Sequence, residues 1–300
     1  MNPYKQNLKH ISLFLDTIKN QKRYSKHTIR AYQVDLNQLA DHLGDEIKVI
    51  DLNKYDLHEY ISLISKSITS KTLSRKIATI KSLFKYLVNE NYIKSNVSKS
   101  IKIPKISKEL PNHLTLDEMN TFFDKTVEIL DIPLRDLVVI DLLYSTGVRA
   151  SECISILIND IDLGNNTIRI SGKGGKERLV VFGDKTKNNL LSYINKEITN
   201  HAGFLFPSKL KKKKAENNFI TSRTIYNIVK KYVKFISNNE KLGPHSLRHS
   251  FATHLLQSGS DLMAIKDLLG HSSLGSTQIY THLDTKRMQE IYKKAHPHAK

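Results

Sequence analysis

TIRISGKGGKERLVVF, residues 167–182, decides the fold class, because it is the clearest pair of strands in the chain. The sequence predicts strands at 168–171 and 178–182, joined by a glycine-rich turn. The periodic segments on either side repeat their apolar residues at helical spacing instead. The chain is therefore predicted to be mainly α-helical with one small β-sheet.

The segment before the hairpin divides into a helical region and a linker. Helices are predicted at 4–20, 28–43 and 54–65, and from Ser70 onward. Helices of this length pack as an α-helical bundle. The stretch that follows is polar and basic, with Pro104 and Pro111 in it, and is predicted to be a linker. The predicted domains are therefore 1–92 and 112–300, joined by 93–111.

The region around the hairpin is also predicted to be mostly helical. Thr115 and Glu118 form a capping box at the start of a helix. Further helices are predicted at 134–145, 151–157, 185–200, 221–237, 244–258 and 262–269.

The charge of the chain indicates an anionic partner. Lys and Arg number 47 and Asp and Glu number 29, which gives a net charge of +18. The basic excess lies in residues 1–100 and 201–300. For a protein without an apolar run long enough to span a membrane, this favours nucleic acid as the partner and the cytoplasm as the location. The single cysteine, Cys153, excludes an internal disulfide and a cysteine zinc cluster.

Arg149 is the first candidate for chemistry, in the segment STGVRASE at 145–152. Gly147 ends one helix, and Arg149 begins the next. Amide donors at a helix start and a guanidinium together bind anions well. Glu152 is placed to brace the arginine, although an ordinary ion pair at a helix start would give the same spacing.

Two lysines at the hairpin tip, in GKGGKER at 172–178, are candidates for protonating a leaving oxygen. Chemistry alone does not separate Lys173 from Lys176, and a basic hairpin turn would look the same. The segment is not a phosphate-binding Walker loop, because the spacing differs and no helix follows.

HSLRH, at 245–249, places His245 and Arg248 on one face of a helix start. His249 and His254 are predicted to be packing residues. The zinc-protease pattern also requires a glutamate between its histidines, and this segment lacks one, so a metal site is not expected.

LGHSSLGSTQIYTH, at 269–282, contains His271 and Tyr280. A single tyrosine usually contributes to packing. Downstream of two arginines, a lysine and two histidines, however, it completes a set of cations for a phosphate, proton-transfer groups and a phenolic nucleophile.

These four segments, in this order and spacing, resemble the tyrosine recombinase (phage integrase) family, and most of all the Xer site-specific recombinases of bacteria. The resemblance covers essentially the whole chain. It implies an N-terminal four-helix core-binding (SAM-like) domain and an α+β catalytic domain.

The resemblance also implies a role for each candidate. Tyr280 attacks the scissile phosphate and forms a 3′-phosphotyrosyl link. Arg149 and Arg248 hold the non-bridging oxygens, and Lys173 is the acid for the 5′-oxygen. The remaining roles are those of His245, a base or acid near the tyrosine, and His271, a hydrogen-bond donor to the phosphate. No ATP, metal or other cofactor is expected.

The implied partners are a double-stranded DNA recombination site and a tetramer formed with itself or with a related recombinase, with a DNA translocase as a candidate activator. The implied function is the resolution of chromosome dimers before cell division. The alternatives are an integrase of a mobile element, a type IB topoisomerase, which shares the chemistry, and a DNA-binding protein without catalysis. The basic tail, 285–300, is expected to dock on a neighbouring protomer.

Overall fold

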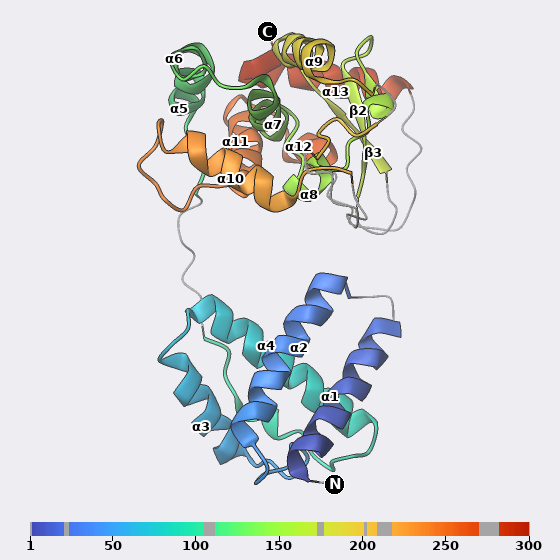
Figure 1. Cartoon of the computed structure of the whole chain (residues 1–300), viewed down its shortest axis with the longest axis vertical. Coiled ribbons are helices and arrows are strands. Elements are labelled where there is room, and N and C mark those ends of the chain that lie inside the picture. Colours follow the sequence, from blue (N-terminus) through green and yellow to red (C-terminus); the bar gives the residue numbers. More distant parts are fainter. Residues whose placement is uncertain are drawn as a thin grey trace. The chain divides into compact units, whose positions relative to one another are not determined.

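The chain forms two compact units, Met1–Lys108 and Glu109–Lys300 (Figure 1). Each unit has its own hydrophobic core. This computed structural model describes residues 2–20, 24–104, 112–172, 177–200, 203–208, 218–269 and 282–299. Most of these residues are helical, and one small sheet lies in the second unit. The predicted fold class is therefore confirmed.

Unit 1 is a bundle of amphipathic helices. They are α1 (Pro3–Asn20), α2 (Lys26–Leu43), α3 (Lys54–Ser65) and α4 (Ser70–Asn89). The hydroxyl of Ser25 accepts a hydrogen bond from the Thr28 amide at 3.1 Å and caps α2. The apolar stripe of α4 is buried along its whole length and fills the centre of the bundle.

A buried carboxylate joins α2 to α4 inside this bundle. Asp35 accepts hydrogen bonds from Lys76 at 3.1 Å and from the Thr79 hydroxyl at 3.1 Å, and it also pairs with Arg75. A buried charge is tolerated only when it is paired and hydrogen-bonded, and Asp35 meets both conditions.

The start of the predicted linker belongs to unit 1. Ile101 is buried in the core of the bundle, and Ile93 and Val97 pack against that core. Val97–Ser100 form a short 3-10 helix, η1. The predicted boundary at residue 92 therefore falls inside the packed unit.

Unit 2 surrounds a central helix with other helices and a sheet. Its helices are α5 (Leu116–Thr121), η2 (Phe122–Thr126), α6 (Val127–Ile129), α7 (Leu134–Ser145), α8 (Ala150–Cys153), η3 (Ile158–Asp160), α9 (Asp184–Glu197), α10 (Ser222–Val233), α11 (Pro244–Gln257), α12 (Leu262–Leu269), α13 (His282–Ala295) and η4 (Pro297–Ala299). Helix α7 is buried on nearly all sides, and α9, α10 and α11 pack against it.

The sheet of unit 2 has three antiparallel strands in the order β1-β2-β3. They are β1 (Ile161–Asp162), β2 (Thr167–Ser171) and β3 (Glu177–Val181). The predicted hairpin is thus present, but the prediction missed β1, which is too short for its two residues to show alternation. Helix 151–157 was also predicted too long, since α8 ends at Cys153.

The C-terminal helix packs on its own unit. Met288, Tyr292 and Ala295 share one face of α13 and are buried in a cluster with Phe251 and Leu255 of α11. In this chain the apolar face of α13 is therefore covered by its own unit. Docking of the tail on a neighbouring protomer stays a prediction. Within the described ranges no helix combines the length and hydropathy required to span a membrane.

Candidate active site

The turn between α7 and α8 is built around a glycine. Gly147 has φ +62°, in the left-handed region that favours glycine. A Cβ at this position would lie 2.6 Å from Cδ1 of Phe251 and 3.0 Å from Cδ2 of Leu269. The turn can therefore lie against α11 and the end of α12 only because this residue has no side chain. It places Arg149 at the start of α8.

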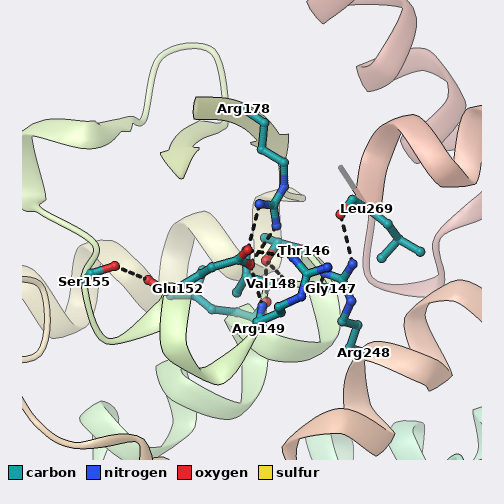
Figure 2. Close-up of polar contacts among 10 residues, drawn as sticks. Thr146, Gly147, Val148, Arg149, Glu152, Ser155, Arg178, Arg248 and Leu269 are labelled. Carbon is teal, nitrogen blue, oxygen red and sulfur yellow. Dashed lines mark hydrogen bonds and ion pairs between the residues drawn. The ribbon is translucent and has the colours of Figure 1, made fainter. Parts of the chain in front are cut away.

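The carboxylate of Glu152 organises the residues after this turn. It accepts hydrogen bonds from the backbone amide of Arg149 at 2.8 Å and from its Nη1 at 2.8 Å. Arg178 of β3 donates two more, from Nη1 at 3.0 Å and from Nη2 at 2.8 Å (Figure 2). The predicted brace between Glu152 and Arg149 is present, and Arg178 is an additional partner that the sequence analysis did not identify.

The charge of Glu152 is stabilised by these contacts. Burial acts to raise the pKa of this carboxyl, but the hydrogen bonds from Arg178 and Arg149, together with the charge of Arg178, lower it to about 2. Glu152 is therefore ionised at neutral pH, and it holds two guanidinium groups with a single negative charge.

Arg149 and Arg178 differ in exposure. The Arg149 side chain is 40% exposed, whereas that of Arg178 is 9% exposed. In the part of the chain that the structure describes, Nε and Nη2 of Arg149 have no hydrogen-bond partner. Arg149 therefore keeps donors available for an anion, while Arg178 is used within the fold.

Arg248 approaches the same turn from α11. It donates hydrogen bonds to the carbonyl of Gly147 and, at 2.9 Å, to the carbonyl of Leu269. Burial, and then the charges of Arg149 and Arg178, lower its pKa to about 10, so it remains protonated at neutral pH. Figure 2 shows Arg149, Arg178 and Arg248 gathered around the α7–α8 turn. The cluster therefore has a net positive charge.

His245 lies in the first turn of α11, one helical turn before Arg248, and is exposed. The two residues share one face of the helix, as the spacing predicts. His254 is instead buried, with its ring nitrogens 2.9 Å from the Tyr144 hydroxyl and 3.0 Å from the Leu114 carbonyl. It is a packing residue, as predicted.

The other predicted site residues, Lys173, His271 and Tyr280, lie outside the described residues, as does Lys176. Segments that flank them nevertheless contact the arginine cluster. Arg178, which lies on β3 shortly after Lys173 and Lys176 in the sequence, binds Glu152. The carbonyl of Leu269, the last described residue before His271, accepts a hydrogen bond from Arg248. The fold thus brings segments that are distant in sequence to one turn.

The described residues do not contain a cluster of three or more His, Cys, Asp or Glu side chains arranged to hold a metal ion. The chemistry available in this cluster comes from guanidinium groups, which bind the oxygens of carboxylates and phosphates in pairs.

Comparison with known families identifies the chain. The model of the phage integrase family matches residues 112–287, more than half of the sequence. The chain belongs to the phage integrase family. The N-terminal SAM-like domain of phage integrases matches residues 11–91, which correspond to the helical bundle of unit 1. The resemblance drawn from the motifs is therefore confirmed, and this phage integrase family member is an enzyme that cuts and rejoins DNA.

Similar proteins extend over the whole chain. Tyrosine recombinase XerC of Thermodesulfovibrio yellowstonii is 38% identical over 300 residues, which cover 97% of each chain. Tyrosine recombinase XerD of Staphylococcus epidermidis is 35% identical over 299 residues, covering 96% of this chain and 99% of the relative. Among solved structures, XerH bound to a palindromic difH substrate after cleavage is 26% identical, with a TM-score of 0.70 over 94% of this chain and 84% of that one.

Proposed function

We propose that this chain is a site-specific recombinase that cleaves and rejoins DNA with Tyr280 as nucleophile and Arg149 and Arg248 as the phosphate-binding pair. The observation that carries this proposal is the convergence of the two arginines on the α7–α8 turn, one with available donors and the other holding the segment that leads to Tyr280. XerH is bound to a difH substrate in its two solved complexes, and the charge of +18 on this chain suits a polyanion such as double-stranded DNA.

The reaction exchanges one phosphoester for another. The phenolic oxygen of Tyr280 attacks the scissile phosphorus, a bond forms between them, and the bond from phosphorus to the 5′-oxygen breaks. The phenolic proton passes to a base, for which His245 is the candidate, and the 5′-oxygen receives a proton from Lys173 or Lys176. The energy of the broken ester is retained in the 3′-phosphotyrosyl link, so rejoining needs no nucleotide.

The arginines act on the charge of the phosphate. In the transition state the non-bridging oxygens gain negative charge, and donors fixed in advance stabilise it without rearrangement. Arg149 is fixed by Glu152, and Arg248 is fixed through the backbone of Gly147 and Leu269. His271 is proposed to add a hydrogen bond to the same phosphate.

The cellular role proposed is the resolution of chromosome dimers in the cytoplasm before cell division. Relatives named XerC and XerD cover nearly the whole chain at 34–38% identity and support this assignment. A tetramer, formed by this chain alone or with a related recombinase, and activation by a DNA translocase are part of the proposal. Recombination at a chromosomal terminus site separates this role from that of a mobile-element integrase, which would act on the attachment sites beside its own gene.

A DNA substrate with a nick close to the cleavage position tests the chemistry. The short 5′-hydroxyl fragment diffuses away after cleavage, so the wild-type protein should accumulate as a covalent adduct. Tyr280→Phe should bind the same DNA and form no adduct. An adduct with Tyr280→Phe would show that another residue is the nucleophile.

A further inference from the structure

Arg178 has no assigned part in the reaction, yet its side chain makes a paired contact with the carboxylate of Glu152. Its guanidinium spans both oxygens of Glu152, at 3.0 and 2.8 Å. Both side chains are buried, with 9% of Arg178 and 6% of Glu152 exposed. A paired contact of this kind fixes the carboxylate in position and in rotation.

This contact determines how Arg149 can bind the same carboxylate. Oε1 of Glu152 accepts from Nη1 of Arg149 and Nη1 of Arg178, while Oε2 accepts from the backbone amide of Arg149 and Nη2 of Arg178. An arginine next to a free carboxylate prefers to pair with both of its oxygens. Arg178 already bridges them, so Arg149 is limited to a single side-chain hydrogen bond.

The limited contact leaves Arg149 available to a ligand. If Arg149 paired with both oxygens of Glu152, two of its nitrogens would be occupied and its charge would be neutralised by one carboxylate. With Arg178 in place, the guanidinium groups of Arg149 and Arg178 share one carboxylate, and the charge of Arg248 lies beside them. The positive charge that Glu152 does not neutralise is then available to stabilise the negative charge of a phosphate.

We infer that Arg178 is a positioning residue for Arg149: it occupies the Glu152 carboxylate so that Arg149 presents its remaining donors and its charge to the scissile phosphate. This inference rests on the proposed role of Arg149. Because Arg178 is the second residue of β3, it also ties the returning strand of the hairpin to α8. The position of the strand and the orientation of Arg149 are thereby linked.

Single-turnover cleavage of the nicked substrate by Arg178→Lys tests the inference. A lysine keeps the charge but cannot span both oxygens of Glu152, so Arg149 is free to pair with the carboxylate. The cleavage rate should fall about 10- to 100-fold, as for a misplaced reacting group, while DNA affinity changes less than about threefold. The matched control is Arg169→Lys on β2, whose side chain is 54% exposed and pairs with Asp160 at 3.2 Å. It should cleave at the wild-type rate.

A double-mutant cycle separates positioning from a general structural effect. If Arg178 acts through Arg149, the Arg178→Lys change should have little further effect on cleavage once Arg149 is alanine. Equal effects in both backgrounds would overturn the inference, as would a wild-type rate for Arg178→Lys. Thermal melting and circular dichroism verify the fold, with Arg178→Gln as a second variant. Loss of fold in both variants would also overturn the inference, since the pair would then be a structural requirement.

The cycle also distinguishes this inference from the proposed function. If Arg149→Ala itself cleaves normally, the proposed role of Arg149 fails. If Arg149→Ala is impaired and Arg178→Lys is not, only the positioning role of Arg178 fails.

Discussion

In each unit of the molecule one buried carboxylate is bound by two basic side chains, of which one is exposed and the other buried. In unit 1, Asp35 binds Arg75, whose side chain is 43% exposed, and Lys76, which is 7% exposed. In unit 2, Glu152 binds Arg149, which is 40% exposed, and Arg178, which is 9% exposed. The composition and burial of an ion cluster therefore do not reveal whether it serves the fold or the chemistry.

The difference lies in where the basic residues come from. Arg75 and Lys76 are neighbours on α4, and with the Thr79 hydroxyl they fasten that helix to Asp35 of α2. Glu152 instead joins the turn before α8 to strand β3. The first cluster fixes two helices, whereas the second holds an exposed arginine at a turn where Arg248 also arrives. Convergence of separate segments therefore distinguishes the candidate active site from the cluster in unit 1.

The largest effect is expected from Asp35→Ala in unit 1. This change leaves Lys76 buried without its carboxylate, and breaking one partner of a buried pair costs about 3–5 kcal/mol. Hydrogen exchange should show reduced protection across α1–α4 with little change in unit 2. Asp16→Ala, at an exposed position on α1, is the control. Unchanged protection in unit 1 would mean that the Asp35 cluster contributes little to stability.

Arg149→Ala should affect chemistry rather than folding. Removing one fixed donor to a developing charge slows a reaction about 100- to 1,000-fold. The cleavage rate at saturating protein should fall by this factor, and the melting temperature should stay near that of the wild type. Arg75→Ala, the exposed arginine of the other cluster, should cleave bound substrate at the normal rate. Similar losses in both variants would remove the distinction between the clusters.

Two glycines with positive φ allow a similar comparison. Gly147→Ala places a methyl group 2.6 Å from Phe251 in addition to the strain at φ +62°, and should cost about 2–3 kcal/mol of unfolding free energy. Gly44→Ala, at φ +56° with nothing within 4 Å, has only the backbone strain and should cost about 1 kcal/mol. Denaturant titration measures both. Equal costs would show that the turn is not tightly packed against α11.

A further effect is expected on acidification. The pKa of Glu152 is lowered to about 2 in the folded chain, from an ordinary value of 4.5, so its contribution to stability is complete above pH 4.5 and is lost as the pH falls toward 2. Melting temperatures measured over this range should decrease less steeply for Glu152→Gln than for the wild type. Parallel curves would show that this carboxyl is not stabilised by the arginines.

The sequence predicts the local parts of this molecule well. The spacing of apolar residues gives the helices of unit 1, and a separation of three residues gives both the Arg149–Glu152 contact and the shared face of His245 and Arg248. These features depend on helix geometry alone. The length of α8 was overestimated because Ile154, Ile156 and Leu157 continue the apolar pattern after the hydrogen-bonded helix has ended.

The tertiary parts could not be predicted in the same way. The contact between Arg178 and Glu152 joins residues 26 positions apart, and nothing in the local pattern marks it. The same holds for the bond from Arg248 to the Leu269 carbonyl, which depends on the packing of α11 against α12. For Lys173, His271 and Tyr280, the motifs remain the basis of the proposed roles.

A substrate with a neutral scissile linkage tests the central claim that Arg149 and Arg248 balance the charge of the scissile phosphate. In a methylphosphonate, one non-bridging oxygen is replaced by a methyl group, so less negative charge develops during cleavage. Arg149→Ala and Arg248→Ala should cut this substrate substantially faster than the ordinary phosphodiester, while Tyr280→Phe should cut neither. If the arginine variants gain nothing from the neutral linkage, the two arginines do not act on the phosphate, and the account of this site is wrong.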